Sequence, residues 1–406
     1  MRPVERRVAT RAQVVEQLRS RIAEEYRPGE LALEGEALRR QGLIPESMDF
    51  EQTMLDLLEE QVAGFYDPTT RSLFVSSWVP RETLNPIMAH EITHALQDQH
   101  FDLLRFVRRQ RGRGDQQLAA TSVTEGDATL VMLLYALGPA GFLLRGLADP
   151  DVLFARDRVS SHSTPRLAAA PRALRDSLIF PYRYGFGLCL RAYQSGGFRA
   201  VDDLLRTPPM STEQVLHPDK LAAREPPVDI PVSIPISMQR DWIAVADDTQ
   251  GELGLRLFAA LAADDTTAAA AAAGWGGDRA VLLAPRPEDA SPGSSREPGT
   301  PTRFALVWTI VFDPASTGPE DAEAREFELV ARRAVRARYP SARVRGSSRD
   351  RWVLATAPDA AAVVARAGRT VVVLDRVPIR AITTTVDSAL RQPYSASAPD
   401  PTTERP

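Results

Sequence analysis

Apolar positions at helical spacing open the chain and predict two helices before residue 64. The first set is Val8, Val15, Leu18 and Ile22, and Pro28-Gly29 ends the pattern. Because side chains three, four and seven residues apart share one face of a helix, this set predicts an amphipathic helix that packs on a core. A second helix is predicted over about residues 50–63, with Met54, Leu57, Leu58 and Val62 on one side.

The pattern changes to that of strands between residues 64 and 75. Residues 64–66 and 72–75 contain aromatic and β-branched side chains, which favour strands. Asp67-Pro68 begins the segment between them, and this pair is typical of a turn. The sequence therefore predicts a short β-hairpin.

Two helices are predicted after the hairpin. Asn85 is a favourable N-cap and Pro86 suits the first helical position, so the first helix is expected from Pro86 to about Val107. The second is long and largely apolar, and it is expected from about Gln116 to Leu137. Together with the hairpin, they predict a mainly helical first domain over residues 1–225.

The composition changes at the proline-rich residues 226–235, which predict a domain boundary. Strands are expected after it at residues 280–283, 304–312, 351–357 and 370–374, and helices at 319–338 and 359–367. This alternation predicts a smaller α+β domain over residues 226–391, so the fold class of the whole chain is α+β. Residues 285–301 are predicted to form a mobile proline-rich loop, and residues 392–406 a disordered tail.

Charge and cysteine content exclude several classes of protein. The chain has 49 Lys and Arg against 53 Asp and Glu, a net charge of -4. Nucleic-acid binders usually carry a basic excess, so no nucleic-acid partner is expected. The single cysteine, Cys189, excludes an internal disulfide and a cysteine-rich zinc site.

No transmembrane segment and no signal peptide are expected. The longest uncharged stretch, residues 128–144, contains Gly138-Pro139. It is shorter than the roughly 20 apolar residues of a spanning helix, so we expect a buried core helix. The charged start of the chain is not followed by an apolar stretch, as a secretory signal would be. The expected location is the cytoplasm, or outside the cell if the true start lies upstream.

The strongest chemical signal is His90-Glu91-Ile92-Thr93-His94, within the first helix after the hairpin. Histidines four residues apart lie one turn apart on one helical face, so both imidazoles can bind one Zn2+ ion. Glu91 directly follows the first histidine, which places its carboxylate beside the metal. There it can take a proton from a metal-activated water, which is the chemistry of the H-E-x-x-H signature.

A third protein ligand is expected from the next helix. Glu125 lies 31 residues after His94 in an apolar stretch, where a carboxylate is costly to bury unless it is paired or bound to a metal. Asp127 is the rival ligand. A ligand histidine also needs a partner for its second ring nitrogen, and Asp98 and Asp127 are the candidates.

Hydrolysis of an amide also needs a donor for the oxyanion that develops in the transition state. Histidine and tyrosine side chains commonly supply it. We take His217 as the first candidate catalytic donor, with Tyr182 and Tyr184 as alternatives.

These residues resemble a zincin metallopeptidase of the gluzincin type, and especially a poorly characterised group of bacterial and archaeal H-E-x-x-H proteins. The blocks that carry the resemblance are residues 90–101, 125–128, 211–218 and 274–279. The resemblance implies a zincin-like fold and one zinc ion held by His90, His94 and Glu125. It also implies that the strand from Leu73 to Ser77 is an edge strand that pairs with extended substrate.

One position departs from that family. Well-studied gluzincins often carry an acidic residue four positions after the ligand glutamate, and this chain has Thr129 there. The groups that orient the ligands must therefore differ, with Asp98 or Asp127 as substitutes.

The sequence thus predicts a zinc-dependent metallopeptidase that hydrolyses peptide bonds of a peptide or protein substrate. Two alternatives are a zincin-like binding module that does not cleave, and a zinc hydrolase of a non-peptide amide. The cleavage specificity, the role of the C-terminal half and the oligomeric state do not follow from the sequence.

Overall fold

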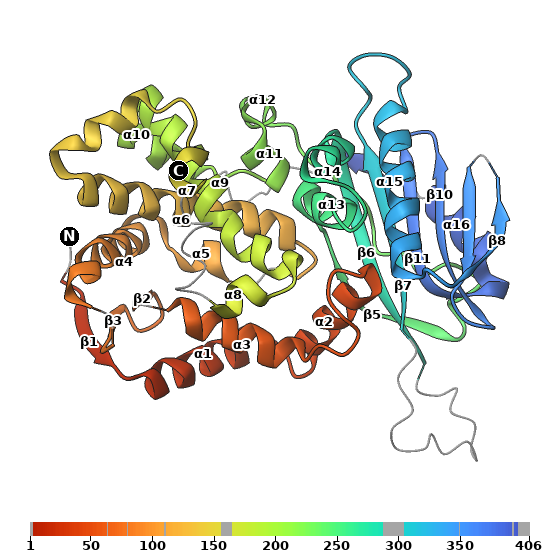
Figure 1. The fold of residues 1–406 in the computed structure, drawn as a ribbon, viewed down its shortest axis with the longest axis horizontal. Coiled ribbons are helices and arrows are strands. Elements are labelled where there is room, and N and C mark those ends of the chain that lie inside the picture. Colours follow the sequence, from red (N-terminus) through yellow and green to blue (C-terminus); the bar gives the residue numbers. More distant parts are fainter. Residues whose placement is uncertain are drawn as a thin grey trace. The chain divides into compact units, whose positions relative to one another are not determined.

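The computed structural model describes residues 3–62, 64–78, 80–108, 111–155, 165–286, 304–348, 350–391 and 394–396. The chain forms two compact units with α+β secondary structure (Figure 1). The first holds residues 1–28, 49–110 and 115–225, and the second holds residues 29–48, 111–114 and 226–406. The main division falls at residue 226, but residues 29–48 and 111–114 belong to the second unit and not, as expected, to the first.

The first unit is mainly helical and carries one three-stranded sheet, ordered β1-β3-β2. Its elements are β1 (Glu5–Ala9), α1 (Arg11–Glu25), α3 (Phe50–Gln61), β2 (Gly64–Asp67), β3 (Ser72–Ser76), α4 (Arg81–Phe101), α5 (Leu104–Val107), α6 (Gly114–Leu137), η1 (Gly138–Gly146), α7 (Asp151–Ala155), α8 (Pro165–Ala169), α9 (Arg172–Gly196), α10 (Phe198–Arg206), α11 (Thr212–Leu216) and α12 (Pro218–Ala223).

The start of the chain differs from the predicted helix. Residues 5–9 form β1, which pairs in parallel with β3, and Val8 is exposed. The helix begins only after Thr10, whose side chain accepts a hydrogen bond from the Gln13 N–H in a capping box. Val8 therefore belongs to a strand, because the cap fixes the first helical residue at Arg11.

The two faces of the small sheet pack against different helices. Leu73 and Val75 lie in one apolar cluster with Ala95 of α4. Phe74 points to the other face, where it packs with Val14 of α1. Because side chains alternate along β3, α4 packs on one face of the sheet. The side of α4 that carries His90 and His94 faces α6.

The boundaries of α4 also differ from the prediction. The helix begins at Arg81, so Pro86 lies inside it, and Asn85 is not its N-cap. It ends at Phe101, where Asp102 adopts a left-handed conformation with φ of 55°, and the expected last turn becomes the separate helix α5. The motif residues 90–94 are helical as predicted.

Helices α6 and α9 cross at very short distance because two glycines meet. A Cβ atom on Gly126 would lie 2.1 Å from the carbonyl oxygen of Gly185, and one on Gly185 would lie 2.0 Å from that of Ser122. Only glycine allows two backbones to approach this closely. Because Gly126 directly follows Glu125, this close crossing packs α9 against α6 at the position of Glu125.

One helical stretch in the described ranges, Gly114–Gly146, is long and apolar enough to cross a membrane by length and composition. A core helix of a soluble protein meets the same two criteria. In α6 the residues around Glu125 are packed inside the first unit, where Ala119, Val123 and Leu130 are fully buried. The stretch is therefore no clear transmembrane segment.

The second unit is built on a seven-stranded sheet, ordered β5-β6-β7-β11-β10-β9-β8, with every neighbouring pair antiparallel. Its elements are α2 (Glu30–Gln41), β4 (Val228–Asp229), β5 (Trp242–Asp248), α13 (Gly251–Ala259), α14 (Asp265–Ala272), β6 (Trp275–Pro285), β7 (Ala305–Phe312), α15 (Ala322–Arg338), β8 (Arg343–Ser347), β9 (Arg351–Ala355), β10 (Ala360–Ala367), β11 (Thr370–Pro378), η4 (Ile379–Ala381), α16 (Ile382–Leu390) and β12 (Ser395–Ala396).

Both faces of this sheet are covered. Val307 on β7 joins an apolar cluster with Val386 of α16. The next residue, Trp308, points to the opposite face, where its ring lies 5.2 Å from that of Phe258 on α13. Because both faces are buried, β7 is buried at every position and apolar at all but Thr309, which hides the alternation expected of a half-exposed strand.

Residues 360–367 form a strand and not the predicted helix. This alanine-rich segment lies between β9 and β11, and Ala361, Val363 and Ala365 are fully buried in the sheet. Pairing on both sides outweighs the helix propensity of alanine, which is a weak preference. Residues 287–301 of the expected loop lie outside the described residues. So does most of the expected tail, but Ser395–Ala396 pairs with β4.

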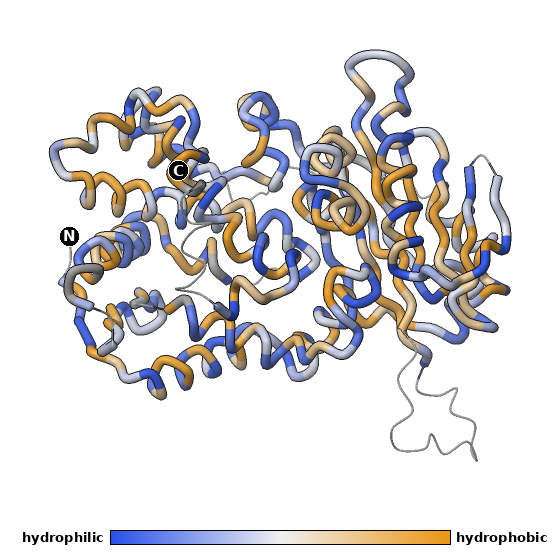
Figure 2. Tube along the Cα trace, viewed as in Figure 1, coloured by the Kyte–Doolittle hydropathy of each residue, from blue (hydrophilic) through white to orange (hydrophobic). Residues whose placement is uncertain are grey.

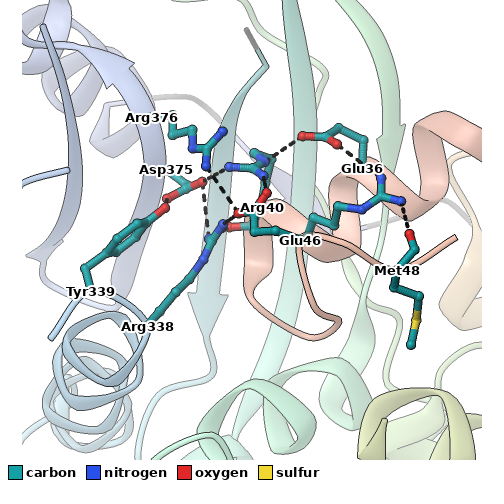
Figure 3. A network of polar contacts seen from close by, with 9 residues as sticks. Glu36, Arg40, Glu46, Met48, Arg338, Tyr339, Asp375 and Arg376 are labelled. Atoms are coloured by element: carbon teal, nitrogen blue, oxygen red, sulfur yellow. Dashed lines mark hydrogen bonds and ion pairs between the residues drawn. The ribbon is translucent and has the colours of Figure 1, made fainter. Parts of the chain in front are cut away.

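Helix α2 is held in the second unit by a buried arginine (Figure 3). Arg40 is 2% exposed, and its guanidinium contacts Glu36 at 2.7 Å and Asp375 of β11 at 3.3 Å. Asp375 also accepts a hydrogen bond from Tyr339 at 2.7 Å. A buried charge requires such partners, which explains why residues 29–48 belong with the sheet.

Candidate metal centre

Two imidazoles meet on the side of α4 that faces α6. The Nε2 atoms of His90 and His94 lie 3.1 Å apart, and their rings are nearly perpendicular at 84°. Both side chains are buried, with 8% of each residue exposed. The spacing of one helical turn thus gives two nitrogens directed at one point.

Glu125 of α6 completes the group. Its Oε2 lies 3.2 Å from His90 Nε2 and 3.5 Å from His94 Nε2. A tetrahedral ion with ligands at about 2.0–2.1 Å requires ligand atoms about 3.3 Å apart. The three observed separations agree with that value, so these residues could hold a metal ion. Asp127, the rival ligand, is not a member of this group.

The negative charge of Glu125 and the positive charge of the protonated His94 stabilise each other. Burial by itself would raise the pKa of Glu125, but the neighbouring His94 and His90 outweigh it and lower the pKa well below its usual value. Burial likewise opposes protonation of His94, but Glu125 outweighs it and raises the pKa of His94 to about 9. In the absence of a metal, the carboxylate is therefore ionised and His94 carries a proton at neutral pH.

Glu91 lies beside this group and is held by the hairpin. Its Oε2 accepts a hydrogen bond from the backbone N–H of Tyr66 on β2 at 2.8 Å. Burial raises the pKa of the Glu91 carboxyl, against the opposing effect of His94 and His90. A fixed carboxylate with a raised pKa has the properties of a general base.

Gln97 orients His94, and the sequence did not single it out. The His94 Nδ1 lies 2.9 Å from Gln97 Oε1. The Gln97 amide nitrogen donates to the Thr124 carbonyl at 3.0 Å and to Asp127 Oδ2 at 2.8 Å. Since both of these groups are acceptors, the amide oxygen must face His94, which then donates from Nδ1 and directs Nε2 to the centre.

Asp98 and Asp127, the two carboxylates predicted to orient the ligand histidines, do not contact the histidine rings directly. Asp98 accepts hydrogen bonds from the Tyr66 hydroxyl at 2.9 Å and from the Leu103 N–H at 3.3 Å, so it connects α4 to the hairpin. Asp127 reaches His94 only through Gln97. Burial raises the pKa of Asp127 to about 6, partly offset by the hydrogen bond from Gln97.

Of the three candidate oxyanion donors, Tyr182 contacts the centre. Its ring stacks 6.1 Å from the ring of His90, and its hydroxyl interacts electrostatically with Glu125. The charge of Glu125, burial and the charge of Glu91 keep the pKa of Tyr182 well above its ordinary value, so the hydroxyl keeps its proton.

The other two candidate donors have contacts of their own. The Tyr184 ring packs 4.9 Å from that of Phe180. His217 joins α11 to α12, where its N–H donates to the Glu213 carbonyl and its carbonyl accepts from the Leu221 N–H. It is not a member of the metal-binding group, and its predicted catalytic role stays a prediction.

The predicted edge strand is wrong. β3 (Ser72–Ser76), which holds most of that segment, is the central strand of its sheet, with β1 on one side and β2 on the other. The edge nearest the centre is β2. The Tyr66 N–H points away from β3 to Glu91, so Gly64, two residues earlier, also directs its backbone groups outward.

Two blocks behind the family resemblance have structural contacts. Thr212 donates from its N–H and its hydroxyl to Asp115, which fixes α11 to the start of α6. Asp278 accepts hydrogen bonds from the indoles of Trp275 at 3.0 Å and Trp308 at 2.9 Å, and from backbone N–H groups at the start of α13. Both carboxylates are buried and anchor elements of their own unit.

Comparison with known proteins adds one match, in the second unit. A family model described as a domain of unknown function, DUF8575, matches residues 240–386. These residues extend from β5 to α16 and so include the seven-stranded sheet. No curated protein and no solved structure matches the chain. The match does not include His90, His94 or Glu125.

Proposed function

We propose that the chain is a zinc-dependent metallopeptidase that hydrolyses peptide bonds. The observation that carries the proposal is the convergence of His90, His94 and Glu125 on one point, with the Glu91 carboxylate beside it. Two imidazoles and one carboxylate are the ligand set of a hydrolytic zinc site that keeps a fourth position for water. The zincin-like fold and the gluzincin class belong to the same proposal.

A zinc ion held by His90, His94 and Glu125 would supply Lewis acidity, which would lower the pKa of a bound water to about 7 and polarise the substrate carbonyl. Glu91 would take a proton from the attacking water as the new C–O bond forms, and would deliver it to the amide nitrogen as the C–N bond then breaks. The Tyr66 N–H holds the Glu91 carboxylate in place for both transfers.

Tyr182 is the proposed donor to the developing oxyanion. Its hydroxyl is protonated, and its ring stacks on that of His90, one of the proposed ligands. Strand β2 is the proposed backbone partner of the substrate, because the outward groups of Gly64 lie beside Glu91. A Cβ atom on Gly64 would lie 3.9 Å from Glu91 Cγ.

The test is Glu91→Gln, assayed with a broad peptide library and by metal content. The variant should retain zinc, since Glu91 is no ligand, and lose about 100- to 10,000-fold in hydrolysis, since the amide cannot accept the proton. Glu51→Gln, an exposed substitution on α3, is the matched control and should match the unmodified chain. Full hydrolysis by Glu91→Gln would overturn the mechanism. Zinc binding by the unmodified chain without any cleavage would favour the binding module.

A further inference from the structure

The first unit exposes a group of large apolar side chains where α6 ends and η1 begins. Phe142 is 70% exposed and Leu143 is 60% exposed, and Tyr135 and Leu137 are exposed before them. Figure 2 shows this part of the chain as predominantly hydrophobic. Scattered apolar side chains are normal on a surface, but an exposed aromatic and aliphatic group in a stretch without charge marks an interaction site.

Phe198 of α10 extends the group. The guanidinium of Arg145 lies 5.3 Å above the Tyr193 ring, and that ring lies 5.0 Å from the ring of Phe198. Gln194 of α9 donates hydrogen bonds to the carbonyls of Leu144 and Leu147, which holds η1 on α9. We call this surface the apolar tip. It consists of Tyr135, Leu137, Phe142, Leu143 and Phe198.

Three arginines flank the apolar tip. They are Arg145 on η1, Arg191 on α9 and Arg199 on α10, all exposed. Within the described ranges, no carboxylate forms an ion pair with any of them. Acidic residues on the same elements are already paired, since Asp202 and Asp203 contact Arg206. The rim of the tip therefore carries positive charge that is available to an outside partner.

Apolar side chains with basic neighbours match the boundary of an anionic lipid bilayer, where acyl chains and phosphate groups meet. The apolar stretch cannot cross the bilayer, because the half of α6 around Glu125 is buried against α4 and α9. Glu125 and Tyr135 are ten residues apart, about 15 Å along a helix, whereas interfacial side chains enter only about 5–10 Å. The tip can thus insert without disturbing the metal centre.

We propose that the apolar tip docks the chain on the surface of anionic membranes, with Phe142 and Leu143 in the interface and the three arginines at lipid phosphates. The docking does not depend on the proposed function. It would hold the metal centre near the membrane surface.

Co-sedimentation of the full chain with vesicles tests the proposal. The probes are vesicles of phosphatidylcholine alone and of phosphatidylcholine mixed with phosphatidylglycerol. The chain should bind the mixed vesicles more tightly, and Phe142→Ser with Leu143→Ser should weaken this binding at least about tenfold, since two large side chains leave the interface. Arg145→Gln and Arg199→Gln should each cost about fivefold on mixed vesicles only.

Matched controls separate docking from general surface effects. Leu329→Ser removes an exposed leucine from α15, and Arg345→Gln removes an exposed arginine from β8. Both should bind like the unmodified chain. Failure of the chain to bind mixed vesicles, or equal losses in the controls, would overturn the proposal. A concentration-dependent dimer that Phe142→Ser abolishes would also overturn it, because a second copy would then cover the tip.

Discussion

Replacing Gln97 by leucine is expected to weaken metal binding although it leaves all three ligands in place. Gln97 is 2% exposed and makes three hydrogen bonds, to His94, the Thr124 carbonyl and Asp127. Leucine has a similar volume but no polar atom. The substitution therefore frees the His94 ring to rotate and leaves buried polar groups without partners.

The magnitude follows from those contacts. Loss of a group that orients a ligand histidine typically costs about 10- to 100-fold in metal affinity, which is about 1.4–2.7 kcal/mol. Each buried polar group left without a partner also costs about 1–3 kcal/mol of folding free energy. Gln97→Leu should therefore lower both the metal affinity and the stability of the metal-free chain.

Competition with a chromophoric zinc chelator measures the affinity, and urea unfolding of the metal-free chain measures the stability. Gln97→Glu retains an acceptor for His94 Nδ1 but places a second carboxylate beside Asp127. It should recover most of the affinity and remain destabilised. Gln52→Leu, at an exposed position of α3, should change neither quantity. Equal zinc affinity in Gln97→Leu and the unmodified chain would refute the assigned role of Gln97.

Three further predictions concern the same centre. Gly126→Ala places a Cβ 2.1 Å from the Gly185 carbonyl, so it should lower the free energy of unfolding by about 1–3 kcal/mol in urea. Gly187→Ala is the control and should not lower it, because the nearest neighbour of its Cβ would be a side-chain atom at 3.4 Å. Equal free energies of unfolding for the two variants would contradict the close crossing. His94 must release its proton to bind a metal, and because Glu125 outweighs burial and raises its pKa to about 9, zinc affinity should rise from neutral pH to about 9 and then level off. Calorimetry in buffers of different ionisation enthalpy should show about one proton released per ion near neutral pH, and no release would contradict this assignment. Tyr182→Phe should keep zinc and lose about 100-fold in kcat, whereas unchanged kcat would remove Tyr182 from the mechanism.

The parts of the centre that depend on local pattern were predictable. The spacing of His90 and His94 on a helix determines that they share a face, whatever the rest of the fold. Glu125 was predictable as a third ligand because a carboxylate in an apolar helix is costly to bury unless it is paired or bound to a metal. The structure brings these three residues together.

Gln97 and β1 depend on contacts distant in sequence, so local pattern does not reveal them. A glutamine has no charge that must be explained when it is buried, and its role becomes visible only where α6 supplies Thr124 and Asp127. Residues 5–9 form a strand because β3 lies beside them, and residues 360–367 do so because β9 and β11 do. Pairing with these strands therefore determines the conformation of both segments and overrides their local preferences.

The most direct test of the central claim is the metal content of the purified chain, measured by elemental analysis together with the Glu125→Ala variant. The account predicts about one zinc ion per chain, and a large loss of zinc from the variant without loss of helical content. A folded chain that binds no metal with His90, His94 and Glu125 all intact, or a variant that retains the full amount, would contradict it.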